Sequence, residues 1–268
     1  MTELNQQLTA PALQAAGLGH HYGSHEVLRD VSFQVSTGEF VCIVGPSGVG
    51  KTTLLRCLSG LQRPSGGSVS FQGAEVSGPP RELALVFQDY SRSLLPWASV
   101  VDNVALPLRA GGLSKRDAAD AAKIALDEVG LGTCDPSAYP WQLSGGMQQR
   151  VAIARALAYK PSIVLMDEPF ASVDAQTRAD LEDLVRRLQV ELGLTVVLVT
   201  HDIDEAVYLA DRIVALAGSP AAVAEVVAVD LGTARDQLDT KLLPRFAELR
   251  AHVYRLIRGA QPVSNTRS

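Results

Sequence analysis

The sequence lacks the cysteine patterns of a disulfide-bonded or redox protein. It has three cysteines, Cys42, Cys57 and Cys134, with no C-x-x-C spacing among them. Two of them lie inside strongly apolar segments, and an odd set of this kind indicates reduced core residues in a cytosolic protein. We therefore expect the fold to depend on its apolar core rather than on cross-links.

The chain also lacks long apolar runs, net positive charge, internal repeats and low-complexity tracts. No apolar run reaches the ~18 residues that span a bilayer, and residues 1–11 have neither the basic start nor the apolar block of a secretory signal. The formal charge of -5 excludes a general field that attracts nucleic acid, but it leaves a local basic patch open. If the protein serves a membrane process, we expect it to act as a peripheral subunit.

The order of segments predicts an α/β fold. A chain of 268 residues with 47% hydrophobic content can form one α/β domain, or such a domain with an inserted subdomain. Apolar runs with the character of buried strands alternate with helical segments; the runs cover 40–44, 83–87, 163–166 and 195–199. This alternation predicts a mostly parallel sheet covered on both faces, with ligand groups gathered at the carboxyl ends of its strands.

A glycine-rich stretch directly after the first run predicts a phosphate-binding loop. It reads Gly45, Pro46, Ser47, Gly48, Val49, Gly50, Lys51, Thr52 and Thr53, the spacing G-x-x-x-x-G-K-T between a strand and a helix. Glycines let backbone N–H groups turn toward phosphate oxygens, and the following helix directs its positive end at the same anion. Lys51 adds charge for the β- and γ-phosphates, and the Thr52 hydroxyl is placed to bind the Mg²⁺ of a nucleotide. An ordinary glycine-rich turn is the alternative, but it rarely has this full spacing.

The ends of the other runs carry residues suited to hydrolysis. A phosphate loop needs a second acidic group for Mg²⁺ and another group for the attacking water. Asp167 suits the first role and Glu168 the second, as general base, because both leave a buried strand; a solvated Asp-Glu turn is the alternative. Gln88 and His201 follow the neighbouring runs. His201 can contact the γ-phosphate there, although a lone histidine is more often structural.

Two further regions are open to more than one interpretation. Tyr22, upstream of the first strands, can stack on a purine or pack on the sheet, and composition alone favours packing. Near the C-terminus, Leu242, Phe246 and Leu249 fall with Val253 and Leu256 on one face of a predicted final helix. That helix most simply packs on the body, and a regulatory role is the alternative.

With these residues collected, the sequence resembles the ATP-binding cassette (ABC) ATPases over about residues 13–230. The decisive motif matches the signature of that family and consists of Leu143, Ser144, Gly145, Gly146, Met147 and Gln148. A phosphate loop alone fits many NTPases, whereas the ordered set of loop, Gln88, signature, Asp167-Glu168 and His201 is specific. The resemblance implies a P-loop NTPase fold of the ABC ATPase type. This fold has a mostly parallel sheet core, antiparallel β-strands near the N-terminus and an inserted α-helical subdomain.

The resemblance also implies roles for the residues. Tyr22 would stack on adenine, which reverses the interpretation from composition, and residues 45–53 would bind the phosphates of ATP. The implied Mg²⁺ ligands are Thr52, Gln88 and Asp167, the last directly or through water. The implied catalytic residues are Glu168, His201 and Gln88.

The signature implies that two copies of the chain share each site. Its glycines precede a helix predicted over 148–159, and the start of a helix attracts anions. In the resembled family, this motif caps the γ-phosphate bound by a second cassette, so that a homodimer encloses two ATP molecules. The segment Ala171-Ser172-Val173-Asp174 matches the loop that crosses this interface. It departs from the commoner Ser-Ala-Leu-Asp but keeps Asp174.

We expect three parts in the chain. They are a flexible N-terminal segment (1–12), an ABC ATPase domain (13–235) with a helical subdomain inserted at about 90–160, and a C-terminal helix and tail (236–268). Within the domain, Gln88–Trp97 mixes polar with large apolar residues and has the character of a surface loop with a partner. The resemblance implies that this loop, with its exposed apolar stretch 94–97, docks to transmembrane permease subunits.

The sequences of segments 88–97 and 167–170 look most similar to those of importer cassettes for nitrate, sulfonate, taurine and related solutes. The resemblance therefore implies a peripheral ATPase on the cytoplasmic face of the cell (inner) membrane. An extracytoplasmic solute-binding protein would serve it indirectly, and nucleic acid would not be a partner. The alternative is a soluble ABC-type ATPase acting in DNA repair or translation. Such proteins usually carry long coiled-coil insertions or two cassettes in one chain, and the sequence has neither.

Overall fold

The computed structural model describes residues 10–89 and 93–259. Most of the predicted N-terminal segment lies outside these residues. So do Tyr90, Ser91 and Arg92 of the predicted docking loop and residues 260–268 of the predicted tail. Within the described residues, no helix is both long and apolar enough to cross a bilayer.

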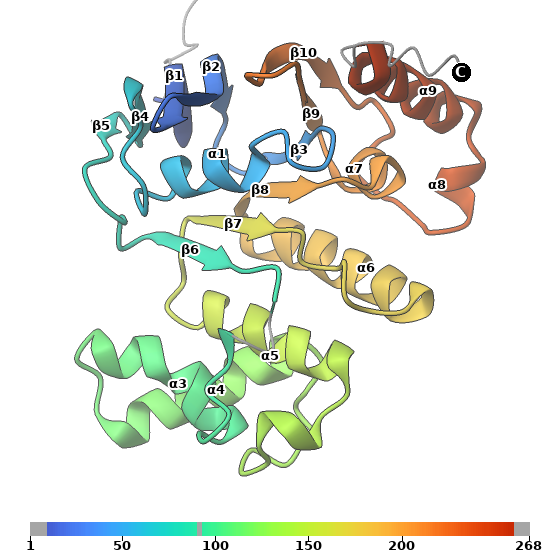
Figure 1. Cartoon of the computed structure of the whole chain (residues 1–268). Helices are drawn as coiled ribbons and strands as arrows, with labels where there is room; N and C mark the ends of the chain where they lie inside the picture. Colours follow the sequence, from blue (N-terminus) through green and yellow to red (C-terminus); the bar gives the residue numbers. More distant parts are fainter. Residues whose placement is uncertain (1–9, 90–92, 260–268) are drawn as a thin grey trace, which may run out of the picture.

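A six-stranded sheet forms the centre of the molecule (Figure 1). Its strands, in spatial order, are β10 (Ala222–Ala228), β9 (Arg212–Ala217), β3 (Phe40–Val44), β8 (Thr195–Thr200), β7 (Ile163–Asp167) and β6 (Leu83–Val86). All neighbours are parallel except the edge pair β9 and β10. The predicted mostly parallel sheet is therefore confirmed, and the carboxyl ends of β3, β6, β7 and β8 lie along one edge.

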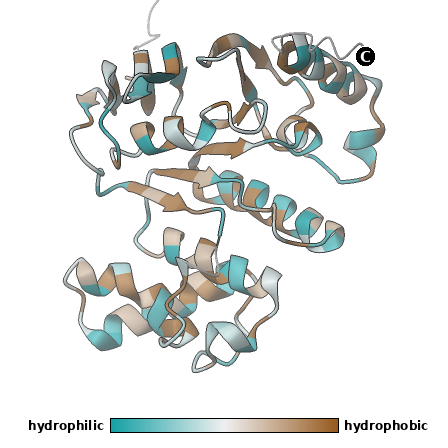
Figure 2. Cartoon of the chain, in the orientation of Figure 1, coloured by the Kyte–Doolittle hydropathy of each residue, from teal (hydrophilic) through white to brown (hydrophobic). Residues whose placement is uncertain are grey.

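The central strands are apolar throughout because they are buried on both faces. In β3, Phe40, Cys42 and Val44 belong to one apolar cluster, whereas Val41 and Ile43 belong to another on the opposite face. This division follows from the two-residue period of a strand, which sends successive side chains to opposite faces. Figure 2 shows the strands of this sheet as brown ribbons between helices of mixed hydropathy.

A smaller antiparallel sheet covers one face of the central sheet. Its order is β2 (His25–Val35), β1 (Leu13–Tyr22), β4 (Gly66–Phe71) and β5 (Ala74–Glu75). Together with helix α1 (Lys51–Leu58), it forms the second apolar cluster, and Leu54 and Leu58 of the helix are fully buried there. The antiparallel strands predicted near the N-terminus are thereby confirmed.

The opposite face is covered by helices, several of which form the lower part of Figure 1. These are α3 (Val100–Ala110), α4 (Lys115–Glu128) and α5 (Gly145–Leu157). Each begins after a serine whose hydroxyl accepts a hydrogen bond from the backbone N–H three residues on. In α4 this serine is Ser114, and the N–H that it accepts from belongs to Asp117.

Further α-helices follow β7 in the chain. They are α6 (Ala175–Leu192), α7 (Ile203–Leu209), α8 (Asp239–Leu242) and α9 (Pro244–Gly259). Of these, α7 packs against β3 and β8, and α9 packs against β9 and β10. Phe246, Leu249 and Val253 of α9 are buried, as predicted. The placement of Leu242 on the same face is wrong, because a separate short helix ends at this residue and leaves its side chain 80% exposed.

Candidate functional site

The phosphate loop joins the end of β3 to the start of α1. Gly50 caps α1 with φ 111°, and it has no side chain to satisfy the first N–H groups of the helix. Those groups are therefore available to an anion. Gly45 has a different role, because a Cβ there would lie 2.9 Å from the carbonyl oxygen of Leu216. A cavity of about 660 Å³ adjoins the loop and is lined in part by Pro46–Val49.

Lys51 is buried inside the loop. Its ammonium donates hydrogen bonds to the carbonyl oxygens of Gly45 at 3.0 Å and Pro46 at 3.1 Å. Burial lowers the pKa of Lys51, and the nearby carboxylates of Glu168 and Asp167 oppose this shift. The side chain is thus fixed across the loop, where a phosphate would supply a further counter-charge.

Thr52 and Asp167 form a second pair at the same edge of the sheet. The Thr52 hydroxyl donates to Oδ1 of Asp167 at 3.4 Å. Asp167 is 7% exposed, and burial raises its pKa, whereas the hydrogen bond from Thr52 lowers it. A hydroxyl beside a carboxylate suits Mg²⁺, which binds proteins through a few oxygen ligands while nucleotide phosphates supply others. Among the described residues, no cluster of three or more His, Cys, Asp or Glu could hold a metal ion unaided.

Glu168 is the point at which the other predicted residues meet. Its Oε2 accepts a hydrogen bond from the Gln88 amide at 3.1 Å and lies 3.0 Å from Nδ1 of His201. Its Oε1 lies 4.0 Å from the ammonium of Lys51. These residues come from the carboxyl ends of β6, β7 and β8 and from α1, so the sheet edge brings them together as expected.

The backbone at Glu168 has a conformation that the sequence did not indicate. Its φ is 42°, in the left-handed region that non-glycine residues rarely adopt. The N–H of Glu168 donates to the carbonyl oxygen of Val199 at 2.8 Å, which holds this conformation in place. Strained residues of this kind cluster at functional sites because the surrounding structure must compensate for them.

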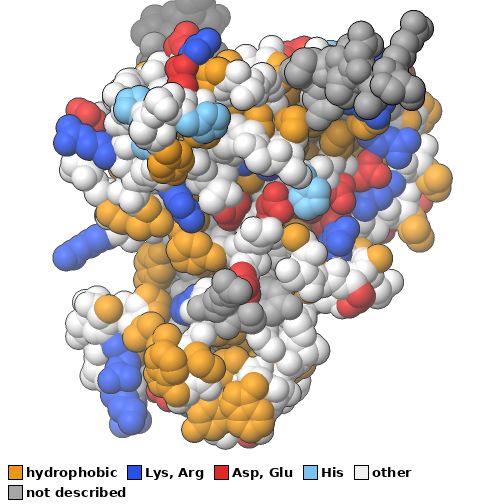
Figure 3. Space-filling model, in the orientation of Figure 1, with side chains coloured by type: hydrophobic (Ala, Val, Ile, Leu, Met, Phe, Trp, Pro, Cys, Tyr) orange, Lys and Arg blue, Asp and Glu red, His pale blue; other side chains and the backbone are white. Residues whose placement is uncertain are grey.

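On the face drawn in Figure 3, acidic and histidine side chains gather near the middle, above the helical part of the molecule. Hydrophobic side chains are more widespread over the helical part below. Among the predicted catalytic residues, Gln88 is exposed, and the side chains of His201 and Glu168 are 53% and 18% exposed, so a substrate can reach them.

Tyr22 lies beside the first turn of α1 and is 48% exposed. Its hydroxyl donates to Oε1 of Gln62 at 3.0 Å, and hydrogen bonds with Thr53 and Gln62 lower its pKa. His20 meets the ring edge-on at 4.8 Å between centroids. The ring therefore has a free face, as stacking on a base requires, and its role in binding adenine stays a prediction. Sequence reasoning missed Gln62 and His20, because only the paired strands and the end of α1 bring them to Tyr22.

The signature forms the start of α5. Ser144 caps this helix and accepts a hydrogen bond from the N–H of Met147 at 3.3 Å. The helix begins at Gly145, so the predicted start at Gln148 is wrong by one turn. Ser144 caps the helix, so its first turn already begins at Gly145. A Cβ on Gly146 would lie 2.4 Å from Cγ2 of Thr177, so this position has no room for a side chain.

Thr177 also connects the signature to the predicted interface loop. Asp174 caps α6 and accepts hydrogen bonds from the N–H of Thr177 at 3.0 Å and from its hydroxyl at 2.6 Å. The hydrogen bonds from Thr177 lower the pKa of Asp174. Within the described residues, no hydrogen bond or ion pair joins the signature to the phosphate loop; α5 and α1 lie against opposite faces of the central sheet (Figure 1).

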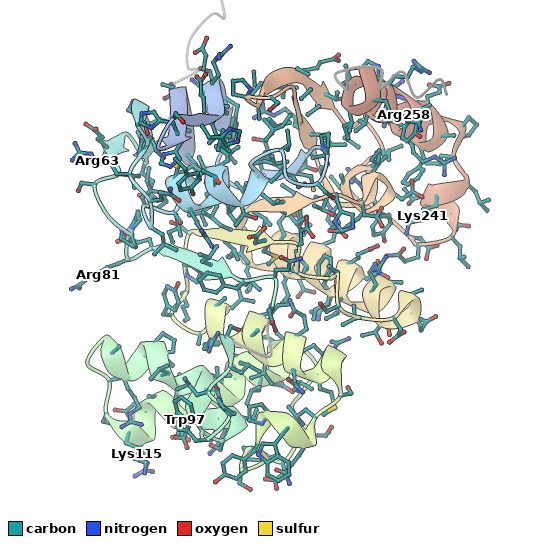
Figure 4. The ribbon with its side chains drawn as sticks, in the orientation of Figure 1. Arg63, Arg81, Trp97, Lys115, Lys241 and Arg258 are labelled. Atoms are coloured by element: carbon teal, nitrogen blue, oxygen red, sulfur yellow. The ribbon has the colours of Figure 1, made fainter. Side chains whose placement is uncertain are left out.

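A buried side chain fixes, through hydrogen bonds, the part of the predicted docking loop that the structure describes after residue 92. Asn103 is fully buried in α3; its side chain accepts from the N–H of Leu95 at 2.8 Å and donates to the carbonyl oxygens of Leu95 and Ala98 at 3.1 Å. The expectation of a fully exposed apolar stretch is wrong at Leu94, which is 1% exposed and anchors the loop in the core. Trp97 is 74% exposed, and Figure 4 shows it on the helical part of the molecule.

A family model described as "ABC transporter" matches residues 28–171. The chain is 44% identical to an aliphatic sulfonates import ATP-binding protein of Xanthomonas axonopodis, over 86% of this chain and 90% of that protein. It is 42% identical to a taurine import ATP-binding protein of Yersinia pestis, over 82% of this chain and 85% of that protein. It is also 42% identical to a nitrate import ATP-binding protein of a Synechocystis strain, over 78% and 77% of the two chains.

Among solved structures, the chain is similar to an ATP-binding cassette in a dimeric, post-hydrolysis state bound to ADP and Pi. The two share 32% identity with a TM-score of 0.70, over 81% of this chain and 98% of the other. The dimeric state and the bound nucleotide are properties of that protein.

Proposed function

The chain belongs to the ABC transporter family, and on that premise we propose that it hydrolyses ATP to drive uptake of a small solute of the nitrate, sulfonate or taurine type. As an import ATP-binding subunit it acts peripherally, in association with membrane-spanning partners. The observation that carries the proposal is the convergence of Gln88 and His201 on Oε2 of Glu168, beside Lys51.

Hydrolysis requires a water molecule directed at the γ-phosphorus. Glu168 serves as the general base that accepts a proton from this water, and its two neighbours orient the carboxylate. Gln88 donates to Oε2, and His201 holds the same oxygen from the adjoining strand end. Lys51 and the N–H groups at the start of α1 bind the phosphate oxygens and stabilise the charge that develops on them.

Thr52 and Asp167 would hold Mg²⁺, with Gln88 as the third contact. Their hydroxyl, carboxylate and amide oxygens are the ligand types that this ion prefers. When bound, the ion supplies charge neutralisation between the β- and γ-phosphates. Asp167, whose pKa is raised by burial, gains from a cation beside it, because the cation favours the carboxylate form.

The second half of each site comes from a second copy of the chain. The signature lies against the face of the sheet opposite α1, so Ser144–Gly146 would complete the phosphate site of a partner rather than its own. The dimeric state of the similar cassette supports this arrangement. Asp174 belongs to the loop that would cross the dimer interface. Thr177 links this loop to the signature, because its hydroxyl donates to Asp174 and its Cγ2 lies where a Cβ on Gly146 would be.

The permease subunits would dock at the loop that ends in Trp97. The loop begins at Gln88, in the hydrolytic site, and ends at Trp97, on the helical part. A displacement of Gln88 during hydrolysis can therefore be transmitted along the loop to the docking surface. Leu94 and Asn103 fix its base, whereas Pro96 and Trp97 remain exposed for a partner. The dimer would sit on the cytoplasmic face of the cell membrane, and an extracytoplasmic solute-binding protein would act through the permease.

The solute class follows from the relatives, which are named for sulfonates, taurine and nitrate. Nitrate and the sulfonates carry an anionic oxo group, and taurine carries a sulfonate together with an ammonium group, so we propose a small solute with such an oxo group. Transport by the chain co-expressed with its permease and binding protein, assayed with a sulfonate, taurine and nitrate, identifies the solute. If ATP turnover shows no stimulation by any of these three solutes in that assembly, the solute class is wrong.

The ATPase activity is tested on the purified chain with Glu168→Gln. The amide cannot accept the proton of water, so turnover should fall by about 10²- to 10⁴-fold while MgATP binding remains. Light scattering should then show a stable MgATP-dependent dimer of the variant. Glu39→Gln is the control, because the Glu39 side chain is also largely buried (12% exposed) but pairs with Arg212, before the start of β3 and away from the carboxyl ends of the strands.

A further inference from the structure

A small cavity lies behind the catalytic pair of Glu168 and His201. Its volume is about 50 Å³, and its lining includes Thr200, Asp202, Arg178 and Glu205 in addition to the pair. A water molecule takes up roughly 30 Å³ of liquid volume, so the cavity has room for one. The lining is almost entirely polar, which favours an occupied cavity over a dry one.

Glu205 faces this cavity from the first turn of α7. It is 5% exposed, and among the described residues its Oε1 has no hydrogen-bond partner. Burial raises the pKa of Glu205 well above its ordinary value, and the negative charges of Glu182 and Asp202 raise it further, against Arg178 and Thr200. Burial therefore favours the neutral form of this carboxyl, which carries a proton.

Arg178 presents a second buried polar atom without a partner, its Nε. The rest of the guanidinium is engaged: Nη1 lies 3.5 Å from Oδ2 of Asp202, and Nη2 donates to the carbonyl oxygen of Val173 at 3.5 Å. Buried polar groups are nearly always satisfied by protein or by ordered water. One water between Nε of Arg178 and Oε1 of Glu205 would satisfy both atoms.

We propose that Glu205 is a positioning residue for ATP hydrolysis, which together with Arg178 binds a buried water in the cavity that Glu168 and His201 also line. This proposal rests on the proposed ATPase function. Arg178 lies one turn after Asp174, and its N–H donates to the Asp174 carbonyl oxygen at 2.9 Å. The water therefore connects the interface loop, through the start of α6, to the residues that activate the attacking water.

Paired substitutions of Glu205 separate this role from a purely structural one. Gln has nearly the shape of Glu and keeps a donor and an acceptor, whereas Met has similar length but no strong polar group. We expect Glu205→Gln to retain kcat within about 3-fold of the wild type. Glu205→Met should lower kcat by about 10- to 100-fold at unchanged KM for MgATP, since small misplacements of catalytic groups have effects of this size. Gln189→Met is the matched control; it removes the polar group of another buried side chain of α6, one that does not line the cavity, and should leave kcat unchanged.

A crystal structure of the full wild-type chain supplies a readout that does not depend on any variant. Density for an ordered water within about 3.2 Å of both Nε of Arg178 and Oε1 of Glu205 is expected, and a dry cavity would overturn the proposal. A loss of kcat in Glu205→Gln equal to that in Glu205→Met would also overturn it, because a charged carboxylate would then be required. Failure of the ATPase function itself appears differently, as a wild-type chain without MgATP turnover.

Discussion

His201 lies with its Nδ1 3.0 Å from Oε2 of Glu168, although 33 positions separate the two residues in the chain (201 − 168). The contact exists because β7 and β8 are parallel neighbours, with Asp167 paired to Val199, so that both strands end at the same edge. Gln88 reaches the same oxygen from the end of β6. One carboxylate oxygen is thus held by the residues that follow two other strands, which fixes the direction in which Glu168 can act.

Replacement of His201 by Ala should therefore impair turnover more than binding. Loss of a group that orients the base and reaches the γ-phosphate should lower kcat by about 10²-fold, with KM for MgATP changed less than 3-fold. Steady-state kinetics on the purified chain measures both. His252→Ala is a matched control, because His252 also lies beside a glutamate, 2.9 Å from Glu225, but on α9. A parallel rise of KM without a change of kcat would show that His201 only binds nucleotide.

Much of this site could be predicted from the sequence because of one geometric rule. Parallel strands buried on both faces appear as continuous apolar runs, and their carboxyl ends share an edge. The residues that follow the runs, Gln88, Asp167, Glu168 and His201, therefore had to lie together. The mostly parallel sheet was predicted on similar local grounds, whereas the antiparallel strands were implied by the resemblance to the ABC ATPases.

The residues that the sequence did not indicate all depend on contacts between distant segments. Asn103 is a polar residue in a largely apolar helix, and only its hydrogen bonds to the neighbouring loop explain its burial. Glu205 has the appearance of an exposed helical glutamate until α6 covers it. Leu94 and Leu242 were misplaced for the same reason, since an apolar side chain in a loop or short helix can be buried or exposed according to what packs over it.

Lys51→Ala tests the phosphate site directly. The ammonium is fixed by the carbonyl oxygens of Gly45 and Pro46, so its charge is directed at one place. A hydrogen bond to a charged group contributes about 1.5–3 kcal/mol, and its loss should weaken MgATP binding by about 10- to 100-fold in calorimetry. Lys241→Ala, on α8 beside Glu182, should bind normally. Normal affinity in Lys51→Ala would contradict the site.

Trp97→Ala tests the docking loop. The side chain is 74% exposed, so its loss should leave the melting temperature and the turnover of the isolated chain unchanged, yet abolish co-purification with the permease subunits. Trp141→Ala is the control, since Trp141 is 70% exposed and outside the loop, and it should keep the permease. Leu94→Ala should differ from both by lowering stability about 2–5 kcal/mol, because it leaves a cavity in the core. Intact co-purification of Trp97→Ala would place the docking surface elsewhere.

Gly146→Ala tests the contact between the signature and the interface loop. The new Cβ would lie 2.4 Å from Cγ2 of Thr177, so the start of α5 must move or Thr177 must turn and release Asp174. Overpacking of this kind costs about 1–3 kcal/mol. We expect a lower melting temperature, and an MgATP-dependent dimer in the Glu168→Gln background weakened by about 10-fold.

A second substitution should reverse this effect. Thr177→Ser removes only Cγ2, the atom in conflict, and keeps the hydroxyl that donates to Asp174 at 2.6 Å. The next nearest atom, Cβ of residue 177, would lie 3.7 Å from the new methyl group, an ordinary contact. Gly146→Ala with Thr177→Ser should therefore recover most of the dimer affinity that Gly146→Ala loses. Thr177→Ser alone should have little effect, so the double-mutant cycle isolates the contact. If the effects of the two substitutions on dimer affinity simply add, the contact with Thr177 is not the reason for glycine at position 146. Gly146 would then be needed to make room for the nucleotide bound by the partner.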